Sequence, residues 1–228
     1  MGIYFGLLRV DKGFVIFADT STDPKRPELS TVFKINEHNA VILKDDIIAG
    51  KLFFQKYLEG VDAANYGFEE IIDQTTKSLN KKDPEFVGKL LTFTFVGYSK
   101  NAKQRTFFDL WFNGDSIVRN YQFHSTEKML FYPEANLGSF LTEKAYSNSM
   151  PLQVALDLMG YVILQYSVLF RHAGIGEDFV VMTISEEGFK ILNKVEIQKL
   201  LENAEQMDVA IRKECVDFFV SNNFGSRK

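Results

Sequence analysis

Cysteine is almost absent from this sequence of 228 residues, in which Cys215 is the single example. One thiol cannot form a disulfide within the chain, so the fold has to be held together by its core. This usage is typical of a reducing compartment, and we expect a cytoplasmic protein. Cys215 falls within an amphipathic helical pattern, and we interpret it as a residue that packs in the core.

A surplus of positive charge is also missing, because 26 Lys and Arg residues stand against 30 Asp and Glu for a formal net charge of −4. Such a chain lacks the electrostatic field that draws proteins to nucleic acid. Its densest basic segment, residues 100–105, has the composition of a hairpin loop. We therefore expect no nucleic-acid partner.

Long apolar runs are absent as well. The most apolar segment, residues 156–170, is interrupted by Asp157 and Gln165. It is also shorter than the roughly 20 apolar residues that a membrane span needs. The first residues show no charged region followed by an apolar run, so we expect neither a targeting segment nor a membrane partner.

Motifs for metals and cofactors are equally scarce. His38, His124 and His172 lie far apart, without Cys or acidic residues at the spacing of metal ligands. The Gly174–Gly176 segment precedes a predicted strand, whereas a phosphate-binding loop opens a helix. The sequence therefore predicts no metal site and no cofactor.

What the sequence does contain is strong alternation of apolar and polar residues, with 46% hydrophobic residues overall. A turn at Asn113–Gly114 between two alternating segments is a strong signal for a hairpin. Strands are predicted at residues 3–8, 14–17, 31–36, 39–44, 91–97, 106–112, 117–124, 178–185 and 189–193, and helices at 47–58, 68–79, 152–170 and 197–218. This order predicts an α+β domain with antiparallel sheets covered by helices. We expect a single domain over residues 1–228, of which 194–228 form a C-terminal amphipathic helical extension.

The first hairpin and several later segments carry a resemblance to a known family. Residues 1–19 form two apolar segments around Asp11-Lys12-Gly13 and end in Phe17-Ala18-Asp19. Further matches, in the same order along the chain, are the strand that ends at Val96-Gly97-Tyr98, the turn Leu137-Gly138-Ser139, the helix that begins at Met150-Pro151, and Gly174 to Ile184. Together they resemble proteasome β-type subunits, which belong to the N-terminal nucleophile hydrolases. The resemblance implies a four-layer α/β/β/α antiparallel sandwich.

The same resemblance implies an incomplete active site. Such an enzyme attacks with the side chain of an amino-terminal Thr, Ser or Cys, and an ungapped match places Ile3 at that position. Asp19, Lys34 and Ser139 match supporting positions of the site, the lysine only after a single deletion. We therefore expect no catalytic residue and regard these three as vestigial.

The function that the resemblance implies is that of a non-catalytic β-type subunit, most like the leaderless type-4 β subunit of eukaryotic proteasomes. Its partners would be other proteasome-like subunits in a ring, or further copies of itself. One alternative is a divergent peptidase or amidase that uses an internal nucleophile, with the candidates near Asp19 being Thr20, Ser21, Thr22 and Ser139. Another is a small-molecule-binding protein that retains the cleft.

Overall fold

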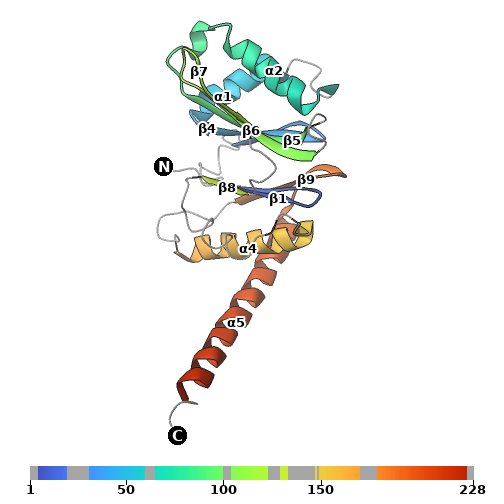
Figure 1. Ribbon diagram of the computed structural model, residues 1–228, viewed down its shortest axis with the longest axis vertical. Coiled ribbons are helices and arrows are strands. Elements are labelled where there is room, and N and C mark those ends of the chain that lie inside the picture. The colour runs from blue at the N-terminus through green and yellow to red at the C-terminus, as the bar shows by residue number, and fades with distance from the viewer. Residues whose placement is uncertain are drawn as a thin grey trace.

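A computed structural model of the chain describes residues 5–19, 31–59, 65–99, 104–122, 129–132, 147, 149–169 and 179–224. These residues form four layers, which Figure 1 shows stacked from top to bottom. Helices α1 and α2 cover one β-sheet, a second β-sheet lies beneath the first, and helices α4 and α5 cover its outer face. The four-layer α/β/β/α antiparallel sandwich that we predicted is therefore confirmed.

The sheet that packs against α4, called sheet A, has the strand order β10-β9-β2-β1-β8. Its strands are β1 (Phe5–Val10), β2 (Gly13–Asp19), β8 (Met129–Tyr132), β9 (Phe179–Ser185) and β10 (Gly188–Ile191). The first hairpin turns tightly at Asp11 and Lys12. A Cβ atom on Gly13 would lie 2.0 Å from the carbonyl oxygen of Ile184, so the approach of β9 to β2 requires glycine there.

The other sheet, called sheet B, follows the chain in the order β3-β4-β5-β6-β7. Its strands are β3 (Val32–Asn36), β4 (Asn39–Asp45), β5 (Leu91–Ser99), β6 (Gln104–Phe112) and β7 (Ile117–Gln122). The side chain of Asn113 accepts hydrogen bonds from the backbone N–H groups of Asp115 and Ser116, which closes the turn between β6 and β7.

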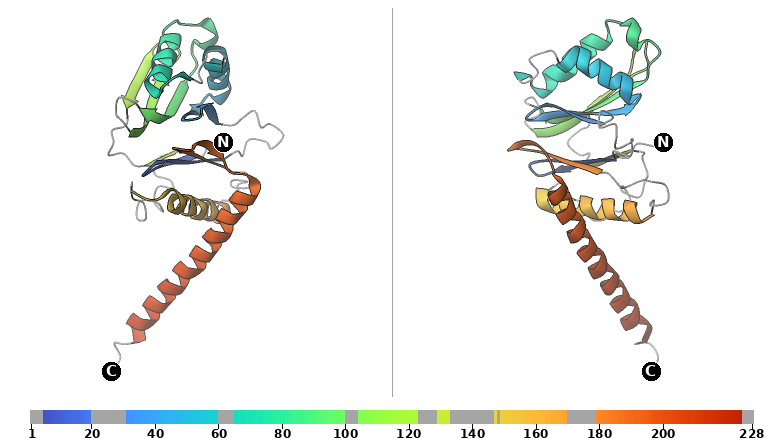
Figure 2. Two further views of the ribbon diagram at one scale, coloured as in Figure 1. Left: turned by 90° about the vertical axis from the view of Figure 1, so that its right-hand side faces the viewer. Right: turned by 180° about the vertical axis from the view of Figure 1, so that it is seen from behind.

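The helices lie on the outer faces of the two sheets. On sheet B these are α1 (Ile47–Phe54), its continuation η2 (Gln55–Glu59), α2 (Phe68–Leu79) and the single turn η4 (Pro84–Phe86). On sheet A they are α4 (Leu152–Leu169) and α5 (Lys194–Phe224). Figure 2 shows from two further sides that the C-terminal half of α5 extends away from the layers.

Three apolar clusters fill the spaces between the layers. One lies between sheet B and its helices and includes Phe53, Phe68 and Phe93. The second lies between sheet A and α4 and α5. The third lies between the two sheets and includes Phe14 of β2 and Phe107 of β6. This last cluster fills only part of the space between the sheets, and the buried charged side chains of Lys44 and Asp109 occupy another part of it.

Most predicted strands and helices are confirmed within the described residues, but two features of the structure differ from our expectations. Strand β8 was not predicted from the sequence. Cys215 is exposed on α5, so our interpretation of it as a core residue was wrong. The segment around Cys215 is helical as predicted, but the helix runs past the layers, so its residues 211–218 are all exposed.

Hydropathy gives one further result. Within the described residues, no helix is both long enough and apolar enough to cross a membrane.

Candidate functional site

The three residues predicted as remnants of an active site lie in different places. Asp19 is the last residue of β2, where its backbone pairs with Phe179 of β9. Lys34 lies on β3, with its ammonium group against the carboxylate of Glu37 and 5.8 Å from the ring centroid of Phe189. Ser139 lies outside the described residues, as does the side chain of Asp19.

Strand register shows how far Lys34 lies from the end of β2. Phe189, over which the Lys34 ammonium lies, pairs with Ile184 of β9. Asp19 pairs with Phe179, five residues away on the same strand. Five strand residues span about 17 Å. The structure therefore brings Lys34 together with Glu37 and Phe189, and not with Asp19.

The sandwich has two distinct ends. The turns β1–β2, β3–β4 and β9–β10 all contribute residues to one pocket and so lie at the same end, which we call the turn end. At this end Arg9 of β1 donates a hydrogen bond to Gln104 of β6 at 3.1 Å, which fixes how the two sheets align. From that contact β2 runs away to Asp19 and β6 runs away to Asp109, so both aspartates lie toward the opposite end.

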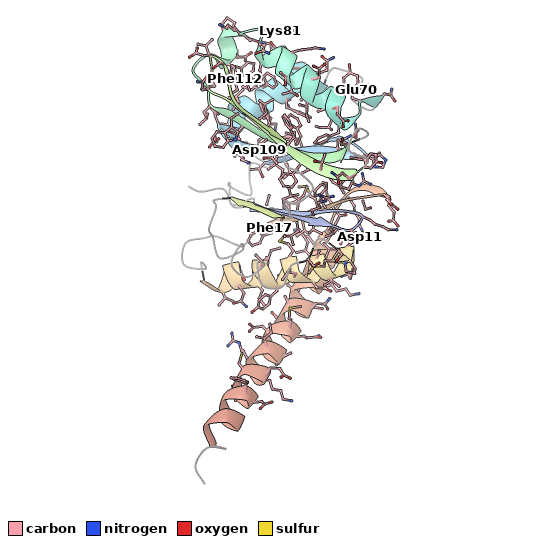
Figure 3. The ribbon with its side chains drawn as sticks, in the orientation of Figure 1. Asp11, Phe17, Glu70, Lys81, Asp109 and Phe112 are labelled. Atoms are coloured by element: carbon pink, nitrogen blue, oxygen red, sulfur yellow. The ribbon has the colours of Figure 1, made fainter. Side chains whose placement is uncertain are left out.

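A buried charged cluster occupies the space between the sheets toward this opposite end. Lys44 of β4 places its Nζ atom 3.3 Å and 3.2 Å from the two carboxylate oxygens of Asp109 on β6. The hydroxyl of Thr94 on β5 donates to the same carboxylate. The side chains of Lys44 and Asp109 are 7% and 5% exposed. We call these three residues the polar cluster; Figure 3 shows Asp109 on the side of sheet B that faces sheet A.

Strand alternation explains why these side chains point inward. Ala40 and Ile42 of β4 belong to the cluster between the sheets, and Lys44 follows at the same two-residue spacing. Phe107 of β6 is also in that cluster, and Asp109 follows it in the same way. The polar cluster therefore continues the inner face of sheet B beyond its apolar part.

The polar cluster was missed from the sequence, although a signal for it was present. Ala40, Ile42 and Lys44 alternate along one strand face, and Phe107 and Asp109 do so along another. A lysine and an aspartate at positions that alternation assigns to a buried face are unusual, because unpaired buried charges are costly. Their pairing requires that β4 and β6 both flank β5, which only the sheet order reveals.

In chemical terms the polar cluster is a positive charge held in place by a carboxylate. Burial reduces screening by water, so an ammonium group there acts on a neighbouring negative charge more strongly than one at the surface. The Thr94 hydroxyl donates to one oxygen of the Asp109 carboxylate and so helps to hold that carboxylate in position beside Lys44. Such an arrangement is suited to stabilising an anion that develops during a reaction.

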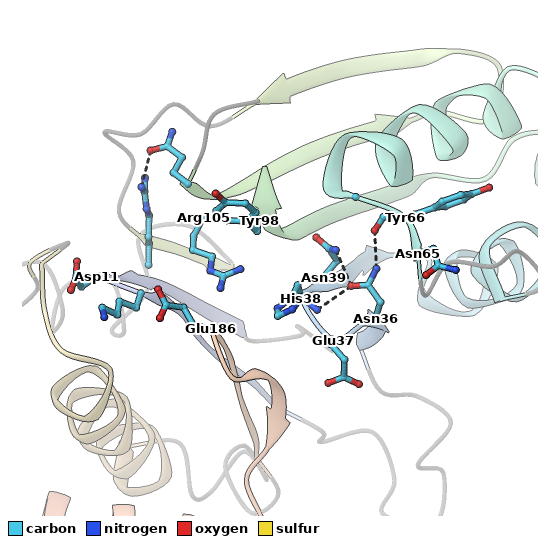
Figure 4. Close-up of a pocket in the computed structure, with 14 residues that line it drawn as sticks. Asp11, Asn36, Glu37, His38, Asn39, Asn65, Tyr66, Tyr98, Arg105 and Glu186 are labelled. Atoms are coloured by element: carbon cyan, nitrogen blue, oxygen red, sulfur yellow. Dashed lines mark hydrogen bonds between the residues drawn. The ribbon is translucent and has the colours of Figure 1, made fainter. Parts of the chain in front are cut away.

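A separate pocket of about 690 Å³ lies at the turn end and is shown in Figure 4. The guanidinium group of Arg105 lies 5.1 Å from the ring centroid of Tyr98. Burial lowers the pKa of Arg105, while the nearby carboxylate of Glu186 opposes this shift. On the other side, Asn36 donates to the carbonyl of Tyr66 at 3.0 Å.

The charges around this pocket balance. Its lining contains the cations Arg9, Lys12 and Arg105 and the anions Asp11, Glu37 and Glu186. No charge of one sign dominates, so the pocket does not select a charged ligand by its net field. It also lies at the end of the sandwich away from Asp19 and the polar cluster.

Comparisons with known proteins agree with the fold. No protein-family model matches the chain, and no curated protein matches its sequence. Among solved structures, the chain is similar to the Anbu (Gly-1) mutant from Hyphomicrobium sp. strain MC1, with a TM-score of 0.68 and 13% sequence identity. The similarity covers 95% of this chain and 99% of that chain. At this identity the similarity shows the fold, which is that of the N-terminal nucleophile hydrolases.

This similarity corrects the closer resemblance that we drew from the sequence. The solved structure that the chain resembles is an Anbu protein, and our assignment to a proteasome β-type subunit of the type-4 kind was wrong. That assignment depended on the first six residues, of which 1–4 lie outside the described residues. Only Phe5 and Gly6 of these six belong to β1, and two strand residues do not distinguish between proteins that share the fold.

Proposed function

We propose that this chain is a divergent hydrolase with the fold of the N-terminal nucleophile hydrolases, cleaving an amide bond with an internal hydroxyl nucleophile. The observation that carries the proposal is the buried polar cluster between the sheets. It lies toward the same end of the sandwich as Asp19, the last residue of β2. The fold match over nearly the whole of both chains supports the reaction class.

The polar cluster supplies what an acyl transfer needs from its surroundings. Attack on an amide carbonyl places negative charge on the carbonyl oxygen, and a fixed positive charge in a region without water stabilises that oxygen. In this proposal the ammonium group of Lys44 provides the charge, and Asp109 and Thr94 keep it in position. The nucleophile is one of the hydroxyls named from the sequence near Asp19, namely Thr20, Ser21, Thr22 or Ser139.

Stability alone is a weak reason for a buried ion pair. Replacing such a pair with apolar side chains of similar volume is often neutral or stabilising, because desolvation offsets the attraction. A pair retained between two sheets that are otherwise packed with apolar residues therefore suggests a functional role.

A covalent probe for serine and threonine hydrolases tests the proposal on the full chain. We expect the probe to label the wild type, and peptide mapping to identify the labelled hydroxyl. Lys44→Met should reduce the labelling rate at least tenfold, whereas Lys44→Arg should retain part of it. The matched control is Lys190→Met, because Lys190 pairs with Glu196 on the surface. Thermal melting must show that each variant is folded before rates are compared.

Two results would contradict the proposed hydrolase activity or the role of the polar cluster in it. If the folded wild type reacts with no such probe and releases no product from peptide and amide substrates, the chain is not a hydrolase of this kind. A labelled hydroxyl whose reaction rate is unchanged by Lys44→Met would remove the polar cluster from the mechanism.

A second candidate is a non-catalytic role in the assembly of a proteolytic ring. The position of Ile3, where the family resemblance expects the nucleophile, favours it. Native mass spectrometry of the protein from its own cells tests it. A closed ring that contains this chain and remains inert to the probe would favour assembly. Under either candidate we propose that residues 1–228 act as one domain in the cytoplasm.

A further inference from the structure

A pair of residues at the turn end of sheet B places a charged group on its inner face. Tyr98 of β5 pairs directly with Arg105 of β6. Two residues further into the sheet, Val96 pairs with Phe107, and both belong to the apolar cluster between the sheets. Because side chains along a strand alternate, Tyr98 and Arg105 also face sheet A. There they line the pocket of about 690 Å³ at the turn end.

Arg105 is a cation that the fold partly removes from water. Its side chain is half-buried, and its guanidinium group lies over the ring of Tyr98, 5.1 Å from the centroid. None of the described residues accepts a hydrogen bond from this group or forms an ion pair with it. Burial lowers the pKa of Arg105, because loss of water disfavours the charged form. The pocket therefore contains a set of N–H donors that a bound acceptor would satisfy.

The other two cations of the pocket lining differ from Arg105. Arg9 donates a hydrogen bond to Gln104 at 3.1 Å, so it already has an acceptor. Lys12 is exposed in the β1–β2 turn, where water solvates its ammonium group. Arg105 therefore gains the most from a ligand that carries an anionic group.

An opposite charge lines the same pocket from sheet A. Glu186 lies in the turn between β9 and β10, and Figure 4 shows Arg105 extending from sheet B toward the side of the pocket where Glu186 lies. The carboxylate of Glu186 is near enough to oppose the pKa shift of Arg105. Glu186 nevertheless forms no ion pair with Arg105 or with any other described residue, whereas Glu37 is paired with Lys34. A gap therefore separates two complementary charges.

We propose that this pocket binds a free α-amino acid in its zwitterionic form, with the carboxylate on Arg105 and the ammonium group beside Glu186. The planar guanidinium fork matches a carboxylate in geometry and can bind it through two parallel hydrogen bonds. The pocket volume lies within the range of small-molecule sites. The site lies away from the polar cluster, so it does not depend on the proposed hydrolase activity.

The charge balance of the lining favours a zwitterion over a phosphate. A phosphate monoester carries nearly two negative charges at neutral pH. The exposed carboxylates of Asp11 and Glu186 would repel it. A zwitterion has no net charge, so the balanced lining does not repel it, and each of its ends meets a group of opposite sign.

Thermal melting of the full chain with each of the standard L-amino acids at millimolar concentration tests the binding. We expect amino acids with uncharged side chains to raise the melting temperature, because a ligand that binds the folded state stabilises it. Titration calorimetry then compares the amino acid that stabilises most with its amide, which lacks the carboxylate, and with its N-acetyl derivative, which lacks the ammonium group. Each derivative should bind about tenfold more weakly or worse, the value of one hydrogen bond to a charged group.

Variants assign the two ends of the ligand. In Arg105→Gln the amino acid and its amide should bind equally weakly, since the group that distinguishes them is gone. In Glu186→Gln the same should hold for the amino acid and its N-acetyl derivative. Glu186 is exposed, so this variant tests the site even if Arg105→Gln fails to fold. The matched control is Lys12→Gln, which removes an exposed cation from the same lining and should bind like the wild type.

Three results overturn the proposal. The first is a melting temperature that no amino acid raises. The second is an amino acid whose affinity is unchanged by both Arg105→Gln and Glu186→Gln, because it then binds elsewhere. The third is inorganic phosphate stabilising the chain more than any amino acid, which would make the pocket an anion site. None of these results affects the labelling of a hydroxyl by the covalent probe, so the hydrolase proposal is tested separately.

Discussion

The two ends of the space between the sheets are built from the same strands but filled with different chemistry. At the turn end, Ala40, Val96 and Phe107 of sheet B face sheet A and are buried. Toward the other end, Lys44 and Asp109 occupy the same strand faces and are just as buried. Alternation decides which face a residue occupies and does not distinguish the ends. The difference therefore cannot come from strand alternation, and our proposal assigns the charged end a role in the reaction.

The strongest way to break this comparison is to remove one member of the buried ion pair. In Asp109→Ala the ammonium group of Lys44 and the hydroxyl of Thr94 both lose the carboxylate that they contact. Removing one partner of a buried ion pair costs about 3–5 kcal/mol. Urea unfolding should show a loss of this size in the free energy of unfolding.

The control for that prediction replaces both charges together. The double variant Lys44→Met with Asp109→Leu removes both charges of the polar cluster, so we expect a stability within about 1 kcal/mol of the wild type, or above it. If the double variant is as unstable as Asp109→Ala, the pair is holding the sheets together, and the functional interpretation of the polar cluster fails.

The matching test at the turn end is Phe107→Ala, two residues earlier on the same strand. Phe107 is 2% exposed, and its ring packs edge-on against Phe14 of sheet A with centroids 6.4 Å apart. Loss of a buried phenylalanine ring costs about 3 kcal/mol or somewhat more. This variant should lose stability but keep the probe reactivity of its folded fraction, whereas a variant of the polar cluster should lose both.

A smaller effect is expected from Thr94→Val, which removes the hydroxyl and keeps the shape. The Thr94 hydroxyl donates to Asp109, and a hydrogen bond to a charged group contributes about 1.5–3 kcal/mol. Because Lys44 still holds the carboxylate, we expect a loss near the lower value. An unfolding curve that matches the wild type would show that Thr94 neither supports nor orients Asp109.

Much of this fold could be predicted from the sequence, because its signals are local. The alternation in 91–97 and 106–112, the Asn113–Gly114 turn and the apolar helix from Leu152 each specify their own element, and each is present. Strand β8 gives a weak signal because it has only four residues, Met129–Tyr132, and pairs with β1 from far along the chain.

The site was harder to predict, because its residues meet only through sheet order. Nothing in the sequence near Lys44 indicates that Asp109, sixty-five residues later, completes its pair. Lys34 was chosen by matching positions in a family, and its contacts with Glu37 and Phe189 depend on a β-bulge between Lys34 and Asn36 and on the stacking of two sheet edges. Local sequence patterns specify neither this bulge nor the way in which the two sheet edges stack.

The smallest expected effect on stability comes from the ion pair between Lys56 and Asp83 at the surface, which we compare with the buried pair of Lys44 and Asp109. Hydrogen bonds from Lys56 and then from Tyr57 lower the pKa of Asp83 from its usual 3.8 to about 2. A carboxyl group whose pKa is lowered by folding stabilises the folded state above its unfolded pKa, and this contribution is lost as the pH falls through the folded value. Stability should therefore decline between about pH 4 and pH 2 through this group.

Urea unfolding at pH 5, 3 and 2 measures that decline. We expect Asp83→Asn to reduce the loss between pH 5 and pH 2, and Lys56→Met to reduce it by a similar amount, because Lys56 is the main cause of the shift. Exposed pairs contribute little because water screens them, so both variants should differ only slightly from the wild type at pH 7. A wild-type pH dependence in both variants would mean that the acid sensitivity arises elsewhere, and the surface pair would then have no measurable role.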